Sequence, residues 1–230
     1  MAKPIIVSPN IIQAGGSLLS GMNDCNIYAV RLANKEVCLI DAGTSYGGMI
    51  MKNIKEAGLS DKISHLILTH CHFDHAGAAW QFKKIMPNMK IIAHQLDADA
   101  IEGKPGTEAM TAAAGYHATY TPVKVDIVLN KDVEEMDLGG TKFTFYHTPG
   151  HTPGSIAVLV EDGGKKVLFG QDIHGPFLEE FKSDLKAWAS SMKVLLGLGV
   201  DILCEGHFGV YNGADKVKDF INEHLKDNGF

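Results

Sequence analysis

Residues 70–75 read His-Cys-His-Phe-Asp-His, and this short run constrains the chain more than any other feature. Side chains alternate in an extended segment, so His70, His72 and Asp74 can share one face. His75 follows where a helix is expected to start, and it can turn toward the same pocket. Imidazole nitrogens and carboxylate oxygens together suit Zn²⁺, Fe or Mn. The run offers more ligands than one metal takes from so short a segment, so it predicts a two-metal site rather than a solvated polar loop.

Three later residues could complete such a site. His151 lies between two Pro-Gly pairs, which favour a tight loop that holds a side chain at low entropic cost. Asp172 follows an apolar strand, and His207 lies just past another short apolar run. Alone, each would more often be a structural loop residue or a turn cap. Beside the run at 70–75 they become candidate ligands.

The rest of the chain alternates between short apolar runs and stretches with helical spacing, and it has no internal repeat or long linker. The expected strands cover residues 4–7, 26–33, 36–40, 65–68, 90–93, 125–129, 133–138, 142–147, 155–160, 166–169 and 201–204. The expected helices cover residues 48–57, 76–86, 97–102, 178–196 and 214–226. Segment 103–122 is the least regular and is expected to be a loop with a helical piece at 108–114. This order predicts one domain, residues 1–230, with two packed sheets and helices outside.

Composition limits the partners and the location. The formal net charge is −6 and Arg31 is the only arginine, so the basic face of a nucleic-acid binder is missing. The cysteines are scattered without a Cys-x-x-Cys pair, which is typical of reduced thiols in a cytosolic protein. The N-terminal apolar run is too short for a secretory signal, and no run is long enough to span a bilayer. We therefore expect a cytoplasmic protein with a small-molecule substrate and no membrane or nucleic-acid partner, and we leave a homodimer open.

The histidines and aspartates described above resemble the motifs of the metallo-β-lactamase superfamily. The His-x-His-x-Asp-His run at 70–75 is followed, in the family's order, by Gly-His-Thr-Pro-Gly at 150–154 and then by a later Asp172 and a final His207. The resemblance covers most of the chain, and the combination is more specific than any single piece. It implies an α+β fold, the four-layer αββα sandwich of that family, which agrees with the element order.

The resemblance also implies a role for each ligand. The first metal would be held by His70, His72 and His151, the second by Asp74, His75 and His207, and both by a bridging Asp172. Asp41 matches an early aspartate of the family that orders the loops beneath the metals. One departure concerns Gln171, which stands where the family often has Gly directly before the bridging Asp.

Such a centre implies a metal-dependent hydrolase. Two cations about 3.5–4 Å apart share a water and lower its pKa toward about 7, so a metal-bridging hydroxide can attack an ester, lactone, thioester or related bond. Zinc is the expected metal, with iron or manganese as alternatives. Asp74 and Asp172 are the expected catalytic residues, because Asp74 can also orient the hydroxide. The thiol of Cys71, between two ligands in an extended segment, is expected to point away and pack.

Two other functions stay open. An iron-dependent non-hydrolytic oxidoreductase, such as a persulfide dioxygenase, would use the same ligands. A β-lactamase is less favoured, because true β-lactamases mostly lack a bridging Asp and are usually secreted. Glyoxalase II and the persulfide dioxygenases usually carry Cys-Gly-Lys/Arg after the bridging Asp, a segment that helps to hold glutathione. Residues 173–177 are instead Ile-His-Gly-Pro-Phe, so a glutathione thioester is less favoured and a lactone or ester fits by elimination.

The substrate wall is expected to come from segment 103–122 and from the loop after the bridging Asp. Tyr116, His117 and Tyr120 are candidate substrate-binding residues in the first, and His174 is a candidate in the second. For each of them a surface or packing role is an equal alternative.

Overall fold

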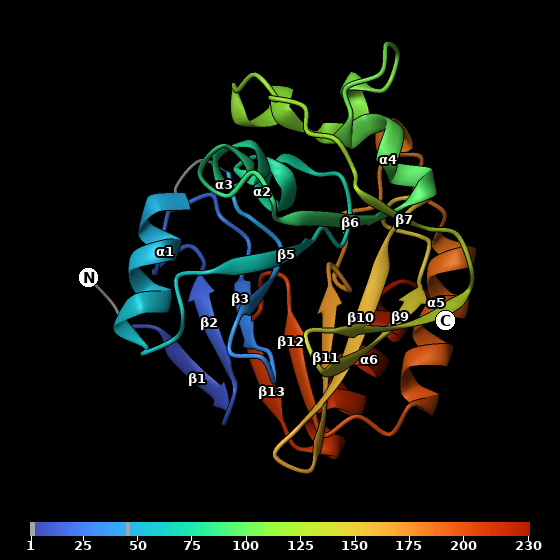
Figure 1. Ribbon diagram of the computed structural model, residues 1–230. Coiled ribbons are helices and arrows are strands. Elements are labelled where there is room, and N and C mark those ends of the chain that lie inside the picture. The colour runs from blue at the N-terminus through green and yellow to red at the C-terminus, as the bar shows by residue number, and fades with distance from the viewer. Residues whose placement is uncertain (1–2, 45–46) are drawn as a thin grey trace.

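The computed structural model describes residues 3–44 and 47–230; Met1 and Ala2, which begin the N-terminal run considered above, lie outside the described residues. Within that part of the chain, two β-sheets pack face to face with helices on their outer faces (Figure 1). The first sheet contains, in chain order, β1 (Ile5–Ser8), β2 (Ile11–Gly15), β3 (Ile27–Arg31), β4 (Val37–Ile40), β5 (Ile63–Ile67), β6 (Lys90–His94) and β7 (Ile127–Leu129). The second contains, from edge to edge, β13 (Val210–Asn212), β12 (Ile202–Glu205), β11 (Lys165–Gln171), β10 (Ile156–Asp162), β9 (Thr141–His147) and β8 (Val133–Leu138).

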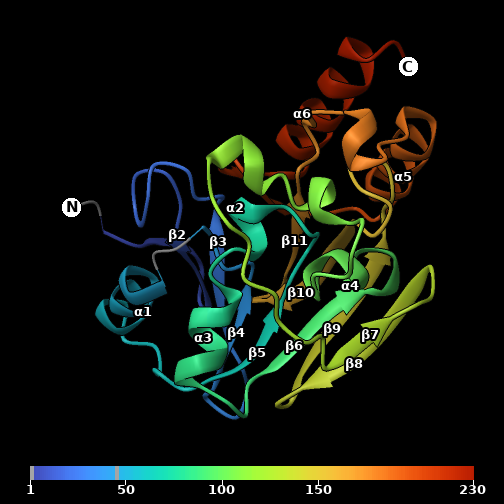
Figure 2. The same cartoon turned by 90° about the horizontal axis from the view of Figure 1, so that it is seen from above.

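The helices form the two outer layers (Figures 1 and 2). The first sheet is covered by α1 (Gly47–Glu56), α2 (Phe73–Ala76), α3 (Ala79–Ile85) and α4 (Gln95–Ile101), and the second by α5 (Leu185–Gly197) and α6 (Ala214–Asp227). Short 3-10 turns follow at η1 (Glu108–Thr111), η2 (Ala113–Tyr116) and η3 (Glu179–Phe181). In the part of the chain that the structure describes, no helix has the length and apolar character needed to cross a bilayer. The predicted four-layer αββα sandwich is confirmed.

Apolar side chains on both faces of each sheet make the core. Between the sheets, Tyr28 and Ile40 of the first sheet share a buried cluster with Phe143 and Phe169 of the second. The outer faces bury a separate cluster under α1–α4 and another under α5 and α6. Each fully buried side chain of this kind contributes about 1.5–3 kcal/mol. The packed layers therefore give the loops at the strand ends a rigid base.

Strand directions bring distant segments to one edge. β4, β5 and β6 are parallel, so residues 68–75 leave the carboxyl end of β5 at a shared edge of the first sheet. In the second sheet β11 and β12 are parallel, which brings Asp172 and His207 to a common edge. The two edges meet, because the backbone N–H of Ile156 in β10 donates to the carbonyl of Thr69, at 2.9 Å. The loop between β9 and β10 therefore arrives at the same place.

Two strands lie where none was expected, β2 and β13. In β2 the polar side chain of Gln13 is buried, and its Nε2 donates to the carbonyl of Gly15 and to Oδ1 of Asn26. A polar residue that is satisfied inside the core hides the apolar pattern of a strand. Sequence patterning alone therefore could not identify β2.

Two expected helices have other bounds. The helix expected at 178–196 begins at Leu185, because the side chain of Asp184 accepts from the backbone N–H groups of the next turn and caps it there. The helix expected at 76–86 is split into α2 and α3 around Gly77. A Cβ on Gly77 would lie 2.6 Å from the carbonyl oxygen of Thr44, so only glycine lets the two segments approach.

Helix α5 presses directly on the loop that carries His151. Gly150 has φ +144°, and a Cβ there would lie 2.4 Å from Cα and 2.6 Å from N of Trp188. Trp188 cannot retreat easily, because it is buried and its Nε1–H donates to the carbonyl of Ile173, at 3.0 Å. Glycine is required at 150 both for its backbone conformation and for this close approach.

We expect Gly150→Ala to destabilise the fold far more than Gly213→Ala. Gly213 also has a positive φ, +118°, but a Cβ there would meet nothing within 4 Å. Backbone strain should cost about 1–2 kcal/mol in both variants, and the clash with α5 should add at least about 2 kcal/mol to the first. Urea unfolding midpoints measure the difference. Equal losses in the two variants would show that the contact with Trp188 relaxes freely.

Candidate metal centre

All seven expected ligands meet at the shared edge of the two sheets. Two groups of side chains have ligand atoms that all lie within 4.8 Å of one another. The first group is His70, His72, His151 and Asp172, and the second is Asp74, His75, Asp172 and His207. Asp172 belongs to both. The grouping matches the division that the sequence resemblance implies.

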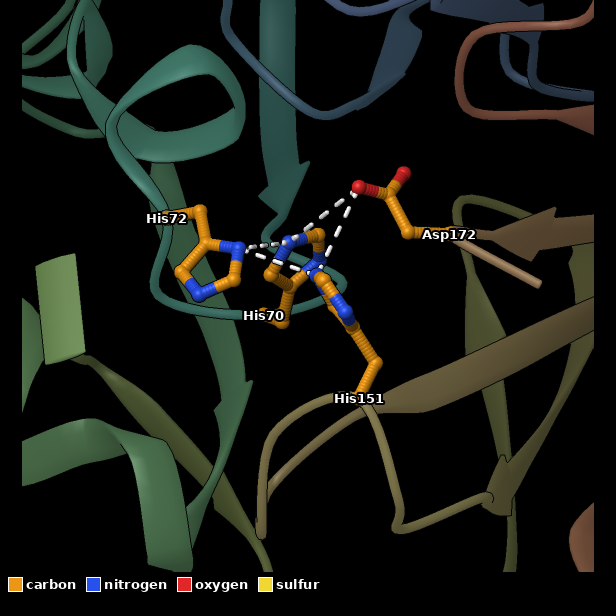
Figure 3. Close-up of side chains that lie close together, drawn as sticks. All are labelled: His70, His72, His151 and Asp172. Carbon is orange, nitrogen blue, oxygen red and sulfur yellow. Dashed lines mark hydrogen bonds and ion pairs between the residues drawn. The ribbon is translucent and has the colours of Figure 1, made fainter. Parts of the chain in front are cut away.

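In the first group, imidazole nitrogens converge on one point (Figure 3). His72 Nδ1 lies 3.1 Å from His70 Nε2 and 2.9 Å from His151 Nε2. Asp172 Oδ2 lies 3.9 Å from His70 Nε2 and 3.5 Å from His151 Nε2. Nitrogens bound tetrahedrally to Zn²⁺ at about 2.0–2.1 Å lie roughly 3.3–3.4 Å apart. The spacing of the three histidines therefore fits a single metal ion.

The second group has mixed nitrogen and oxygen donors. His207 Nε2 lies 3.1 Å from Asp74 Oδ2 and 3.4 Å from His75 Nε2. Asp74 Oδ2 lies 3.6 Å from His75 Nε2. These separations are also those of ligands around one divalent cation. His207 is the least buried ligand, so this group faces the open side of the site.

Asp172 lies between the two groups, and its carboxyl oxygens contact residues of both. Its Oδ1 lies 3.2 Å from His75 Nε2, and its Oδ2 lies near His70 and His151 of the first group and 3.4 Å from His207. Oδ1 is buried and has no hydrogen-bond partner among the described residues. A buried carboxyl oxygen is costly unless positive charge satisfies it, and here that charge can come from the neighbouring His75 or from a metal ion. The donor set around this carboxylate fits two metal ions.

The pKa values of the histidines shift in opposite directions in the two groups. Burial, helped by the neighbouring imidazoles, lowers the pKa of His70 and brings that of His72 to about 3, so both stay neutral as metal ligands must be. Burial opposes protonation of His75 and His207 as well, but nearby negative groups, Asp172 and Asp74 among them, outweigh it. The pKa of His207 rises to about 10, and that of His75 rises well above its usual value. Protons thus occupy the second group in the absence of a cation.

Two hydrogen bonds fix which ring nitrogen faces the metals. His75 Nδ1 donates to Asp41 Oδ2, at 2.8 Å, and His151 Nδ1 donates to the carbonyl of Pro176, at 2.8 Å. In both rings Nε2 is left for the centre. Asp41 also accepts the backbone N–H and the hydroxyl of Thr69, each at 2.8 Å, so it orders the loop below the metals as expected.

Two buried carboxylates that the sequence did not reveal hold the ligand loops. Asp97, in α4, accepts the backbone N–H of Cys71 at 2.9 Å, the hydroxyl of Thr152 at 2.7 Å and the N–H of Gly154 at 2.8 Å. It therefore ties the run at 70–75 to the loop of His151. In sequence it is only an acidic residue in the first turn of an expected short helix, which is a common capping pattern.

Glu205, at the end of β12, holds the loop that carries the final ligand, His207. One carboxyl oxygen accepts the backbone N–H groups of His207 and Phe208, both at 2.7 Å, and the other lies 2.8 Å from His174 Nδ1. Glu205 is completely buried. It fixes the loop of His207 and the ring of His174 together, and a strand-end glutamate carries no sequence signal for that role.

Gln171 has an unusual backbone conformation. Its φ is +47°, in the left-handed region, where glycine is favoured. This explains why a glycine before the bridging Asp suits the family. Gln171 keeps the conformation because its side-chain Oε1 accepts the backbone N–H of Asp172, at 2.7 Å. The departure from the family pattern therefore leaves the local geometry in place.

A cavity of about 570 Å³ opens over the ligands. Its wall includes Tyr116 from η2 and His174 from the loop after β11, as expected. The other two candidates lie elsewhere. His117 is exposed outside this wall, and Tyr120 packs against the core under the first sheet while its hydroxyl donates to the carbonyl of Ile101, at 3.2 Å.

The Cys71 thiol points away from the metals. Its Sγ donates to the carbonyl of Met110, at 3.2 Å, and burial raises its pKa well above the usual value. It therefore packs as a neutral thiol, as the extended segment predicted.

Known proteins resemble this chain in sequence and in fold. Human acyl-coenzyme A thioesterase MBLAC2 is 24% identical over 90% of this chain and 81% of its own length. Hydroxyacylglutathione hydrolase GloC of Haemophilus influenzae is 31% identical over 80% of this chain and 85% of its own. Among solved structures, the native FEZ-1 metallo-β-lactamase of Legionella gormanii superposes with a TM-score of 0.80 at 21% identity, covering 99% of this chain and 94% of that one, which shows the shared fold.

The sequence profile of the Metallo-beta-lactamase superfamily matches residues 21–207, a span that contains every ligand of the centre. The match, the fold and the ligand geometry agree, and the chain belongs to the metallo-β-lactamase superfamily.

Proposed function

We propose that this protein is a hydrolase with two divalent metal ions, zinc first among them, that cleaves a carboxylic ester, lactone or thioester. The observation that carries the proposal is Asp172, whose carboxylate belongs to both ligand groups. One structural zinc would need only four ligands, and this site gathers seven. When bound, two such cations supply a hydroxide nucleophile near neutral pH and polarise the scissile carbonyl.

The residues of the chain hold and orient the reactants. Asp74 lines the cavity, and although burial opposes it, the charges of His75 and His207 lower its pKa, so it stays ionised. An ionised Asp74 can accept a hydrogen bond from the attacking nucleophile and aim it. His174 also lines the cavity, and because its Nδ1 faces Glu205, its Nε2 is the nitrogen left to contact substrate.

The wall of the cavity favours a substrate without negative charge near the reacting bond. Among the described residues that line it there is no lysine or arginine, and Glu180 is present. Lys104, one cation that could have turned inward, is paired with Asp99 at 2.5 Å. A glutathione carboxylate needs a cation partner. The two relatives named as a thioesterase and a hydroxyacylglutathione hydrolase keep a thioester bond among the candidates.

We expect zinc to bind the metal-free protein at two ions per chain and to release protons at pH 7. His207, with a pKa of about 10, and His75, whose pKa is also raised, are protonated at pH 7 and must lose their protons to become ligands. Calorimetric titrations in buffers of different ionisation enthalpy measure both numbers. One ion at saturation would contradict the two-metal centre. Tight binding of iron, with no hydrolysis by either metal form, would favour the oxidoreductase alternative.

Asp172→Ala should lower kcat/KM at least about 100-fold and loosen at least one metal, because the carboxylate screens two cations that otherwise repel each other. Asp219→Ala is the matched control, since Asp219 is an exposed carboxylate on α6. Elemental analysis of both variants, beside kinetics with excess zinc, is the measurement. Retention of both metals and of full turnover by the Asp172 variant would show that Asp172 is not the bridge.

Activated aryl esters and lactones should be hydrolysed measurably, and S-lactoylglutathione much more weakly. The wall gives the glutathione carboxylates no cation and sets Glu180 against them. Comparison of kcat/KM for the three substrates with the zinc-loaded protein decides the matter. A preference for the glutathione thioester of ten-fold or more, equal to about 1.4 kcal/mol of transition-state binding, would overturn this expectation.

A further inference from the structure

Segment 103–122, the least regular part of the sequence, forms an arch at the edge of the metal site. η1 and η2 make the arch, which stands above α4 in Figure 1. Ala112 joins them with φ +55°, a left-handed conformation that only surrounding contacts hold in place for a residue other than glycine. Such a conformation indicates a fixed shape rather than a loose loop.

Contacts on both sides anchor the arch to the catalytic half of the molecule. Met110, in η1, is buried in the core under the first sheet, and its carbonyl accepts the thiol hydrogen of Cys71. Cys71 lies between the ligands His70 and His72. Across the cavity, η1 also contacts η3. The arch is therefore held at a defined place relative to the metals.

A second cavity, of about 430 Å³, lies within the arch. Small side chains dominate its wall, which also includes three threonines, Tyr120 and Glu108; the alanines that line it are Ala100, Ala109, Ala113, Ala114 and Ala118. Glu108, the charged residue among the lining side chains, is engaged with the backbone N–H of Gly106, at 2.9 Å. Methyl groups cannot fill this space themselves, so the cavity suits a slender apolar ligand.

The two cavities adjoin. Ala109 and Ala114 line both the arch cavity and the cavity over the metal ligands. A substrate whose carbonyl lies at the metals can therefore extend past these two alanines into the arch. Larger side chains at either position would close that route.

We propose that the arch cavity binds the apolar acyl chain of the substrate, so that the enzyme selects medium-chain acyl esters or thioesters. This inference rests on the proposed hydrolase function and names the substrate class of the same site. The chain is assigned to the acyl side rather than to the leaving group, because the leaving group must depart toward the open side, where His207 is partly exposed.

The first test varies chain length on each side of the bond, using the zinc-loaded protein. In p-nitrophenyl esters from acetate to dodecanoate, kcat/KM should rise about two- to four-fold for each added methylene and level off when the cavity is full. In thioacetates with alkyl leaving groups of the same lengths, it should stay nearly flat. A flat acyl series would overturn the proposal, and so would a rise confined to the leaving-group series.

The second test fills the cavity. Ala118 lines the arch cavity but not the cavity over the metals, so Ala118→Leu should lower the decanoate-to-acetate ratio of kcat/KM at least ten-fold. Ala118→Val, a milder change in case the leucine variant folds poorly, should lower it less. Ala214→Leu, at an exposed alanine that begins α6, is the control and should leave the ratio unchanged. An unchanged ratio in both Ala118 variants, with melting temperatures near wild type, would refute the assignment.

A binding measurement separates failure of this inference from failure of the hydrolase function. Calorimetry with octanoate and acetate needs no turnover. Octanoate should bind at least ten-fold more tightly than acetate, and Ala118→Leu should remove the difference. If no ester is hydrolysed while this difference persists, the hydrolase proposal is wrong and the chain site stands. If octanoate and acetate bind alike, the chain site is wrong whatever the activity.

Discussion

A buried carboxylate surrounded by imidazoles sets the architecture of the site. Asp172 is 3% exposed, and one of its oxygens has no hydrogen-bond partner among the described residues. Burying an ionised carboxylate costs several kcal/mol unless positive charge compensates it. The groups that face it are imidazoles from loops of both sheets. Without a cation, His70 stays neutral, whereas His75 and His207 hold protons. Cations resolve both problems at once, because they neutralise the carboxylate and take the nitrogen lone pairs. The sandwich serves to bring those ligands to one point.

The ligand side chains contact one another, but those contacts do not hold their backbone segments in place. Other buried carboxylates do so from behind: Asp41 fixes His75, Asp97 ties the run at 70–75 to the loop of His151, and Glu205 fixes the loop of His207. Each accepts at least one backbone N–H, so each fixes main chain and not only a side chain. This preorganisation keeps the imidazole rings within binding distance of one metal ion. The free energy needed to bring the ligands together is therefore supplied by folding and not by metal binding.

How much of this could be predicted depends on how local the signal is. The run at 70–75 places four candidate ligands within six adjacent residues, so a metal site can be predicted from the sequence alone. Asp172 and His207 were found because strand ends are recognisable and parallel strands share an edge. The supporting roles of Asp97 and Glu205 could not be predicted, because no side-chain pattern marks them. Asp97 accepts from backbone groups 26 and 57 residues away, and Glu205 accepts from the backbone N–H two residues along. Tyr120 does not line the cavity over the ligands: its hydroxyl donates to a backbone carbonyl of α4, and it lines the adjoining arch cavity instead.

The ligands and their supporting carboxylates are structurally constrained in this protein, whereas the residues that line the cavities can vary. Ligands and their supporting carboxylates lie at strand ends, at helix starts and in tight loops braced by the packed layers, so a change in any of them disturbs the others. The arch touches the cavity and is bonded to the ligand run through Cys71, whose thiol meets the Met110 carbonyl. The loop after β11 is tied more closely to the centre, because the Pro176 carbonyl accepts from His151 Nδ1 and His174 Nδ1 faces Glu205. Relatives that are 24% and 31% identical to this chain are named for different hydrolase activities, so membership of the superfamily does not by itself specify a substrate. The choice must lie in the walls of the two cavities. Among the described residues, these walls consist largely of alanine, threonine and aromatic side chains, with two glutamates and no lysine or arginine. Small side chains leave room, and room beside a metal centre without a cationic clamp favours an uncharged chain over an anionic one.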